Sequence, residues 1–269
     1  MPQLKFHDFF ASQLTLHRYD LEDTFQVVVG EHTSGVPKTF TLHTQVFAER
    51  SPFLAVARKR EETAQDRMRP GYLKLKDPEL FKIYINCVYF GQNFINQYGD
   101  AHQLSFSRND LDSERAYEAA DVVFDKLTSL CLLAIEMRDY KTANMVIDEI
   151  IRFSDLSMSY PRRNSIELVY AYNAEDRQPL RLLMRDFWIY ECYGRDIELI
   201  RDEDYHADFV RDVAISLLDI RVLRECTEKF DVDRRVMKNC SEDPCYYHVH
   251  DEMHPRCAPE PFEEIVPHR

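Results

Sequence analysis

Scarcity of glycine is the feature that most constrains this chain. It has six glycines among 269 residues, whereas average usage of about 7% would give nearly twenty. Because glycine supplies the backbone conformations of tight turns and phosphate-binding loops, a chain this poor in it builds few of either. The patterns G-x-G-x-x-G, G-x-x-x-x-G-K-[ST] and G-x-S-x-G are all absent. Dinucleotide, P-loop and common serine-hydrolase chemistry are therefore excluded, and a helix-dominated scaffold is favoured.

Composition and charge set the broad class. Hydrophobic residues make up 45% and charged residues 30% of the chain, which is typical of one large or two modest globular domains. The net charge of -13 is spread along the chain, because residues 1–156 carry 18 basic and 23 acidic residues and the remainder carry 16 and 24. DNA-binding proteins neutralise phosphates with clustered Lys and Arg. Direct nucleic-acid binding is therefore not expected.

The sequence also bears on cellular location. No apolar run approaches the roughly 18 residues of a membrane span, and residues 1–20 are polar and charged throughout, unlike a signal or transit peptide. The cysteines number seven, and four of them stand singly in apolar or helical patterns: Cys87, Cys131, Cys192 and Cys226. We expect an intracellular protein, cytoplasmic or nuclear, with reduced thiols and no membrane contact.

The first part of the chain predicts a mixture of strands and helices. The β-branched run Val27-Val28-Val29 ends at Gly30, and a short turn leads to a second strand, so a hairpin is expected. Ser51 before Pro52 and Asp77 before Pro78 are helix start signals. The expected elements are a helix at 4–16, strands at 25–29, 38–42 and 71–75, a helical turn near 44–47, and helices at 53–60 and from 78.

The remainder predicts helices and loops. Residues 91–112 are polar and aperiodic, which indicates an inserted loop, and helical spacing follows at 113–127, 130–137 and 140–150. The helix opened by Pro179 is expected to bury Leu180, Leu183, Met184 and Phe187, and a later helix to bury Phe209, Val213, Leu217 and Ile220. The predicted divisions are an N-terminal helical segment 1–19, a domain 20–156, a helical extension 157–238 and a Cys/His/Pro-rich tail 239–269.

This order of elements resembles the BTB/POZ domain over residues 20–156. Residues 40–54, FTLHTQVFAERSPFL, are similar to the family's hallmark segment, in which an apolar strand ends in His and a helical turn precedes Ser and an aromatic residue. Residues 71–81 and 84–91 are similar to the strand and helix that follow it. The extension resembles that of stand-alone fungal BTB-domain proteins. The resemblance implies an α+β, helix-rich fold: a BTB/POZ-like core of about three strands with a cluster of helices, followed by an all-α extension.

The resemblance implies a non-enzymatic protein–protein interaction module that forms homodimers and recruits other proteins. The expected dimer element is the N-terminal helix near Phe9, Phe10 and Leu14, whose apolar stripe could equally pack on its own core. The alternative role is substrate adaptor of a cullin-type ubiquitin ligase. No catalytic or cofactor-binding residues are identified, because His43 is expected to pack or cap and Ser51 to cap a helix.

One constellation could hold a metal. Residues 240–257 contain three Cys and three His, six of eighteen positions, while the other 251 residues hold eleven such side chains. Cys245-x2-His248 has the spacing of a metal-binding turn, His248-x-His250 places both imidazoles on one face of an extended chain, and Cys257 would complete a tetrahedron. Cys245, His248, His250 and Cys257 are therefore the candidate ligands of a structural zinc ion, with packing of the tail without metal as the alternative.

A metal-dependent enzyme that uses this tail is the third functional alternative, and it is disfavoured. His250 and His254 frame an H-x-E-x-H order instead of the H-E-x-x-H order of zincins. On a helix Glu252 would lie on the side opposite both imidazoles, where it could not activate a metal-bound water.

Overall fold

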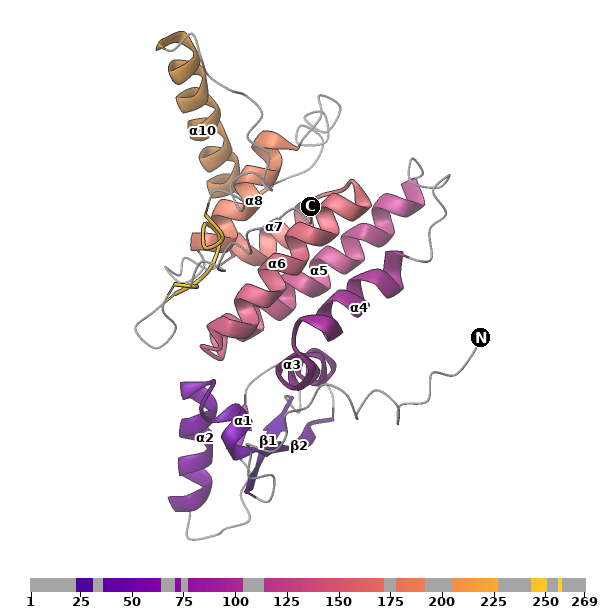
Figure 1. Ribbon diagram of the computed structural model, residues 1–269, viewed down its shortest axis with the longest axis vertical. Coiled ribbons are helices and arrows are strands. Elements are labelled where there is room, and N and C mark those ends of the chain that lie inside the picture. Colours follow the sequence, from indigo (N-terminus) through magenta and orange to yellow (C-terminus); the bar gives the residue numbers. More distant parts are fainter. Residues whose placement is uncertain are drawn as a thin grey trace, which may run out of the picture. The chain divides into compact units, whose positions relative to one another are not determined.

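The computed structural model describes residues 23–30, 36–63, 71–73, 77–103, 114–171, 178–191, 205–226, 243–250 and 256–257 (Figure 1). The fold is helix-rich α+β and divides into two compact units, Met1–Phe81 and Lys82–Arg269. The predicted dimer helix at 4–16 lies outside the described residues. No helix of the described ranges combines the length and apolarity needed to cross a membrane.

The first unit contains a three-stranded mixed sheet. Its strands are β1 (Thr24–Val29), β2 (Lys38–His43) and β3 (Gly71–Leu73), in the order β2-β1-β3. β1 pairs antiparallel with β2, which confirms the predicted hairpin, and parallel with β3. Alternate residues of β1 are buried, as the period of two in a strand requires. Gly30 ends β1 with a φ of 118°, a conformation that side chains with a Cβ rarely adopt.

Two short helices, α1 (Thr44–Phe47) and α2 (Pro52–Thr63), follow the hairpin. The Leu54 backbone N–H donates to Ser51 Oγ at 3.2 Å, which confirms Ser51 as the N-cap of α2. His43 occupies the N-cap position of α1 without a side-chain capping bond.

Helix α3 (Pro78–Phe90) begins in the first unit. Asp77 Oδ1 accepts from the Glu79 N–H at 2.9 Å, which confirms the start signal at this proline. The Phe81 ring packs edge-on against Phe40 of β2, with centroids 5.1 Å apart. The first turn of α3 is therefore fixed to the sheet.

The second unit is helical in the residues described. Helices α4, α5 and α6 contact one another and lie side by side in Figure 1, and α7, α8 and α10 also form contacts with their neighbours. The helices are α4 (Gln92–Gln103), α5 (Glu114–Glu136), α6 (Tyr140–Ser157), α7 (Arg163–Tyr170), α8 (Gln178–Tyr190) and α10 (Ala207–Cys226).

The start of α6 is fixed by a buried carboxylate. Asp139 Oδ1 accepts from the Thr142 backbone N–H at 3.1 Å, while Oδ2 accepts from the Thr142 hydroxyl at 2.6 Å and the Tyr84 hydroxyl at 3.0 Å. This N-cap joins α6 to α3 at Tyr84 and sets the position of α6. The candidate site lies on this helix.

Two features of the second unit differ from the sequence predictions. The polar stretch predicted as a loop contains α4, whose Ile95 is buried and whose Gln92 side chain donates to the Met145 carbonyl of α6 at 3.4 Å. The two helices predicted at 113–127 and 130–137 form one continuous helix, α5.

An aromatic cluster joins α7, α8 and the start of α10. Trp188 packs edge-on against Tyr160, Tyr205 and Phe209, with centroids 5.2 to 5.7 Å apart, and its indole N–H donates to the Pro161 carbonyl at 3.2 Å. Tyr170 packs against the same Phe209 ring at 5.4 Å. The cluster anchors α10 through its first turn.

Candidate metal centre

Residues 243–250 and 256–257, which we call the Cys/His segment, pack on helices of the second unit. The segment begins with a tight turn in which Asp243 Oδ1 accepts from the Cys245 N–H at 2.9 Å and the Asp243 carbonyl accepts from the Tyr246 N–H at 2.9 Å. The His248 N–H then donates to the Cys245 carbonyl at 3.1 Å. These bonds bring Cys245 and His248 together, as the two-residue spacing predicts.

The next residues alternate between the protein interior and the site. Tyr247 and Val249 are buried, whereas His248 and His250 lie on the other side with ring centroids 5.9 Å apart. This alternation confirms the prediction that the two imidazoles share one face of an extended chain.

Two polar anchors hold the segment in register. The Asn144 side chain of α6 forms two hydrogen bonds with the Val249 backbone: its Nδ2 donates to the carbonyl at 3.0 Å, and its Oδ1 accepts from the N–H at 2.7 Å. The Tyr247 hydroxyl donates to Asp186 Oδ2 of α8 at 3.0 Å. Because both anchors are buried, shifting the segment by one residue would leave several polar groups without partners.

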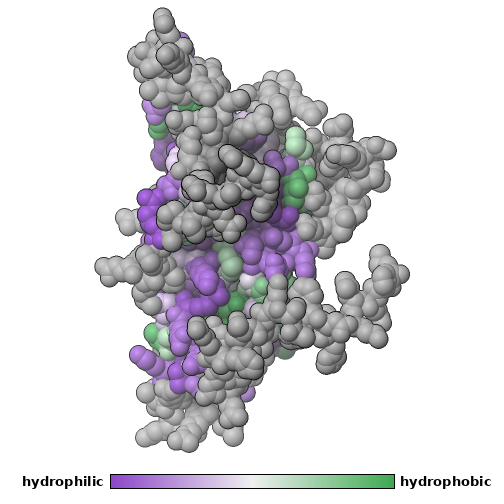
Figure 2. All heavy atoms as spheres, in the orientation of Figure 1, coloured by the Kyte–Doolittle hydropathy of each residue, from purple (hydrophilic) through white to green (hydrophobic). Residues whose placement is uncertain are grey.

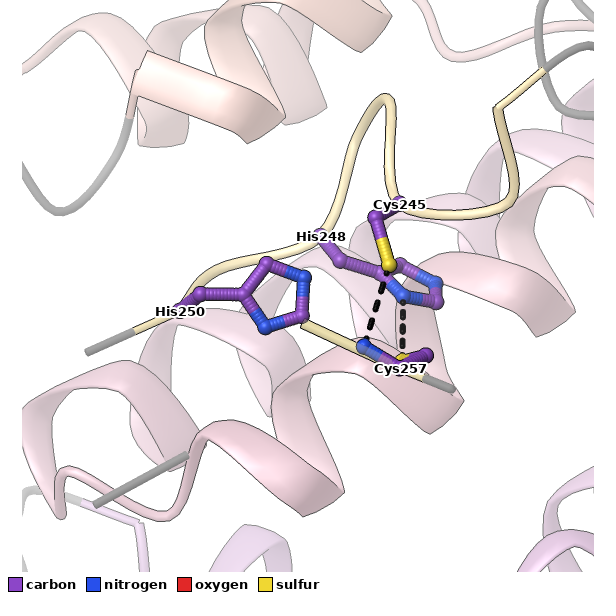
Figure 3. Close-up of side chains that lie close together, drawn as sticks. All are labelled: Cys245, His248, His250 and Cys257. Carbon is purple, nitrogen blue, oxygen red and sulfur yellow. Dashed lines mark hydrogen bonds between the residues drawn. The ribbon is translucent and has the colours of Figure 1, made fainter. Parts of the chain in front are cut away.

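Figure 3 shows the side chains of Cys245, His248, His250 and Cys257 pointing toward one another. One ligand atom from each lies within 4.8 Å of all the others. The Cys257 N–H donates to Cys245 Sγ at 3.3 Å, and Cys257 Sγ lies 3.4 Å from His248 Nδ1. The four predicted ligands therefore meet at one point, in a donor set that could hold a metal ion.

Helix α6 contributes a carboxylate behind this cluster. Asp148 Oδ1 lies 2.9 Å from His248 Nε2, on the side of the ring opposite the Cys257 contact. Asp148 lies one helical turn after Asn144, so one face of α6 contacts both the Val249 backbone and the His248 imidazole.

The pKa values of acidic groups around the segment are shifted in different directions. Burial raises the pKa of Asp186 above its usual value, although Arg185 and the Tyr247 hydroxyl oppose that shift. Desolvation is the main cause that raises the pKa of the Cys257 thiol, and the neighbouring Cys245 raises it further. The Cys245 N–H lowers the pKa of Asp243, and Arg256 adds to this effect through a 2.5 Å bond. The Asp243–Arg256 pair brings the residue before Cys257 to the turn that carries Cys245.

Replacing Asp186 tests the anchor on α8. Asp186→Ala is expected to lower the free energy of unfolding by about 1–3 kcal/mol at pH 7, because it leaves the buried Tyr247 hydroxyl without its acceptor. Asp186→Asn keeps an acceptor and removes the cost of a buried charge.

The pH dependence of stability separates the loss of the hydrogen-bond acceptor from the cost of the buried charge. The folded-state pKa of Asp186 is raised above its usual 3.8, so the folded state binds the proton more tightly than the unfolded state does. The stabilisation from this proton is complete below pH 3.8 and is lost as pH rises through the folded-state pKa. Urea unfolding between pH 4 and pH 7 should therefore show Asp186→Asn gaining on the wild type as pH rises. A constant difference over this range would contradict the argument.

Sequence reasoning missed the supports of the cluster. Asp148, Asn144 and Asp186 lie 61 to 105 residues from their partners in the segment, and no local spacing connects them. Cys240 and His254, the other members of the Cys/His-rich stretch, lie outside the described residues.

No family model, curated protein or solved structure matches this chain.

Proposed function

We propose that this protein is a non-enzymatic protein–protein interaction module with a BTB/POZ-like core and a helical extension. The observation that carries the proposal is the exposed apolar face of α10. Val210, Leu217 and Leu218 are between 41% and 59% exposed, and the helical period places them on one face of α10. Contiguous exposed apolar residues mark interaction sites more often than chance exposure does.

The exposure arises from the way α10 is attached. Phe209 is buried in the aromatic cluster, and the helix carries apolar residues on a second face at positions 210, 214, 217 and 218. The prediction that Leu217 packs inward is wrong, because it lies on this second face with 48% of its surface exposed. A helix with apolar residues on two faces has one face available to a partner. Among the coloured residues of Figure 2, hydrophilic side chains prevail and apolar side chains form small separate areas.

The order of elements supports the BTB/POZ-like core. Two antiparallel strands, two short helices, a third strand and α3 follow one another in the order that the resemblance implies. Helix α4 is an addition between α3 and the helical pair α5 and α6. A core of this kind is a scaffold for recognition, so partners would include a second copy of the chain and other proteins.

Changing the α10 face tests the proposal. The double variant Leu217→Asp/Leu218→Asp should reduce recovery of co-purifying proteins at least about tenfold in affinity purification with mass spectrometry, since burying either leucine contributes about 1.5–3 kcal/mol. The matched control is Val122→Asp on α5, which charges another exposed apolar position and should keep the partners. Circular dichroism checks that both variants stay helical.

The identities of the lost partners separate the roles. Loss of self-association, measured by sedimentation at tens of micromolar, would assign the face to a homodimer. Loss of a cullin would assign it to the ligase-adaptor role. Equal recovery by the double variant and the wild type would contradict binding through α10.

A further inference from the structure

We propose that Cys245, His248, His250 and Cys257 bind one zinc ion, and that this ion fastens the Cys/His segment to α6. The donor set is the first argument. Two thiolates and two imidazoles form a closed tetrahedral set of the kind that structural zinc sites use. Hard cations require oxygen ligands, so this set does not suit them. A Rieske [2Fe–2S] cluster also uses two Cys and two His, but it binds them on two different irons, whereas the four ligand atoms here all lie within 4.8 Å of one another, as a single ion requires.

The spacing of the ligand atoms is the second argument. With Zn–S near 2.3 Å and Zn–N near 2.0–2.1 Å, neighbouring ligands in a tetrahedron lie about 3.3–3.8 Å apart. The Cys257 Sγ to His248 Nδ1 distance is already 3.4 Å, and the largest separation in the set is 4.8 Å. Shifts of about 1 Å, within the reach of side-chain rotation, bring all four atoms to bonding distance.

Asp148 supplies the third argument, because it specifies the tautomer of His248. Its carboxylate holds the Nε2 side of the ring at 2.9 Å, so the proton belongs on Nε2 and the Nδ1 lone pair faces Cys257. Histidines that bind metals commonly donate their other N–H to a carboxylate in this manner. Asp148 is thus a positioning residue from α6, and the ion links that helix to the chain around residue 257.

The rival explanation is a disulfide between Cys245 and Cys257. It accounts for the two sulfurs but leaves His248, His250 and the aligned Asp148 unexplained. A catalytic ion is also disfavoured, because four protein ligands leave no open position for a water or substrate. The site is therefore structural: it closes the loop between residues 245 and 257 over the Asn144 and Asp186 anchors.

Zinc content tests the assignment. The full-length protein, purified under reducing conditions, should contain one zinc ion per chain by native mass spectrometry and elemental analysis. Cys245→Ala and His248→Ala should lose the ion, while the matched control Cys87→Ala, which removes a buried thiol far from the cluster in sequence, should keep it. Asp148→Asn should weaken zinc affinity about 10–100-fold in chelator competition. Asp155→Asn, an exposed aspartate on the same helix, should leave the affinity unchanged.

A measurement on the wild type tests the proposal even if the variants fail to fold. Stepwise modification of cysteine thiols should release the ion only after the two most protected metal-bound thiols react, as read with a zinc-sensitive dye. A chain that is metal-free and does not take up added zinc would overturn the proposal. So would zinc retained by both ligand variants, or a mass two daltons lower that shows a Cys245–Cys257 disulfide in the reduced preparation.

Discussion

Withdrawing zinc with an excess of chelator is expected to lower the stability of the unit Lys82–Arg269 by about 4 kcal/mol. That value corresponds to free zinc at about a thousand times its dissociation constant, since a ligand that binds the folded state stabilises it by the logarithm of its saturation. For a unit of this size, about 4 kcal/mol corresponds to a fall of roughly 8–16 °C in the midpoint of its thermal transition.

The effect should be local before it is global. Without the ion, the Cys/His segment is held by the Asn144 and Asp186 anchors alone, so the Val249 N–H, which donates to Asn144, should exchange faster. Calorimetry measures the shift in the transition, and hydrogen-exchange mass spectrometry locates the change. The double variant Cys245→Ala/Cys257→Ala is the control, because its transition should not respond to the chelator. A wild-type transition that moves by less than about 1 °C would contradict a stabilising role for the ion.

Removing the side chain of Trp188 should destabilise the second unit by about 3–5 kcal/mol. The indole packs on Tyr160, Tyr205 and Phe209 and donates to the Pro161 carbonyl. Trp188→Ala therefore leaves a cavity where α8 meets α10 and removes the donor to a buried carbonyl. Trp188→Phe should cost less, because it retains one aromatic ring and loses mainly the hydrogen bond.

Urea unfolding followed by circular dichroism measures both Trp188 variants. Phe53→Ala is the matched control, since Phe53 is a 44% exposed aromatic residue of the first unit and its loss should change the free energy of unfolding by less than about 1 kcal/mol. A cost below about 1 kcal/mol for Trp188→Ala would show that the aromatic cluster does not hold α10.

Periodicity predicted the elements whose packing is one-sided. The hairpin and the helix starts at Ser51 and Asp77 were predicted, because each is specified by neighbouring residues. In α8, Leu180, Leu183, Met184 and Phe187 are all buried as predicted. A helix that covers a core with one face shows this spacing in its sequence.

The errors occur where the pattern is weak or ambiguous. Helix α4 is rich in Asn and Gln, and among the side chains described in it (residues 92–97) only Phe94 and Ile95 are apolar, which is too few to show a period. In α10, apolar residues occupy two faces, so the sequence could not tell which face is buried. Tertiary contacts decide both cases.

The grouping of the four candidate ligands could be predicted because these residues are close in sequence and unusual in composition. Four residues within thirteen positions define the cluster without knowledge of the fold. Asp148 could not be predicted, since it lies 100 residues from His248 and is one of many aspartates in an acidic chain. Only the packing of the segment on α6 distinguishes it from the others.

X-ray absorption at the zinc edge tests the central claim most directly. We expect two sulfur ligands at about 2.3 Å and two nitrogen ligands at about 2.0–2.1 Å, with one sulfur lost in Cys257→Ser. Binding of zinc by oxygen and nitrogen atoms alone, or by four sulfurs, would contradict the assignment of Cys245, His248, His250 and Cys257.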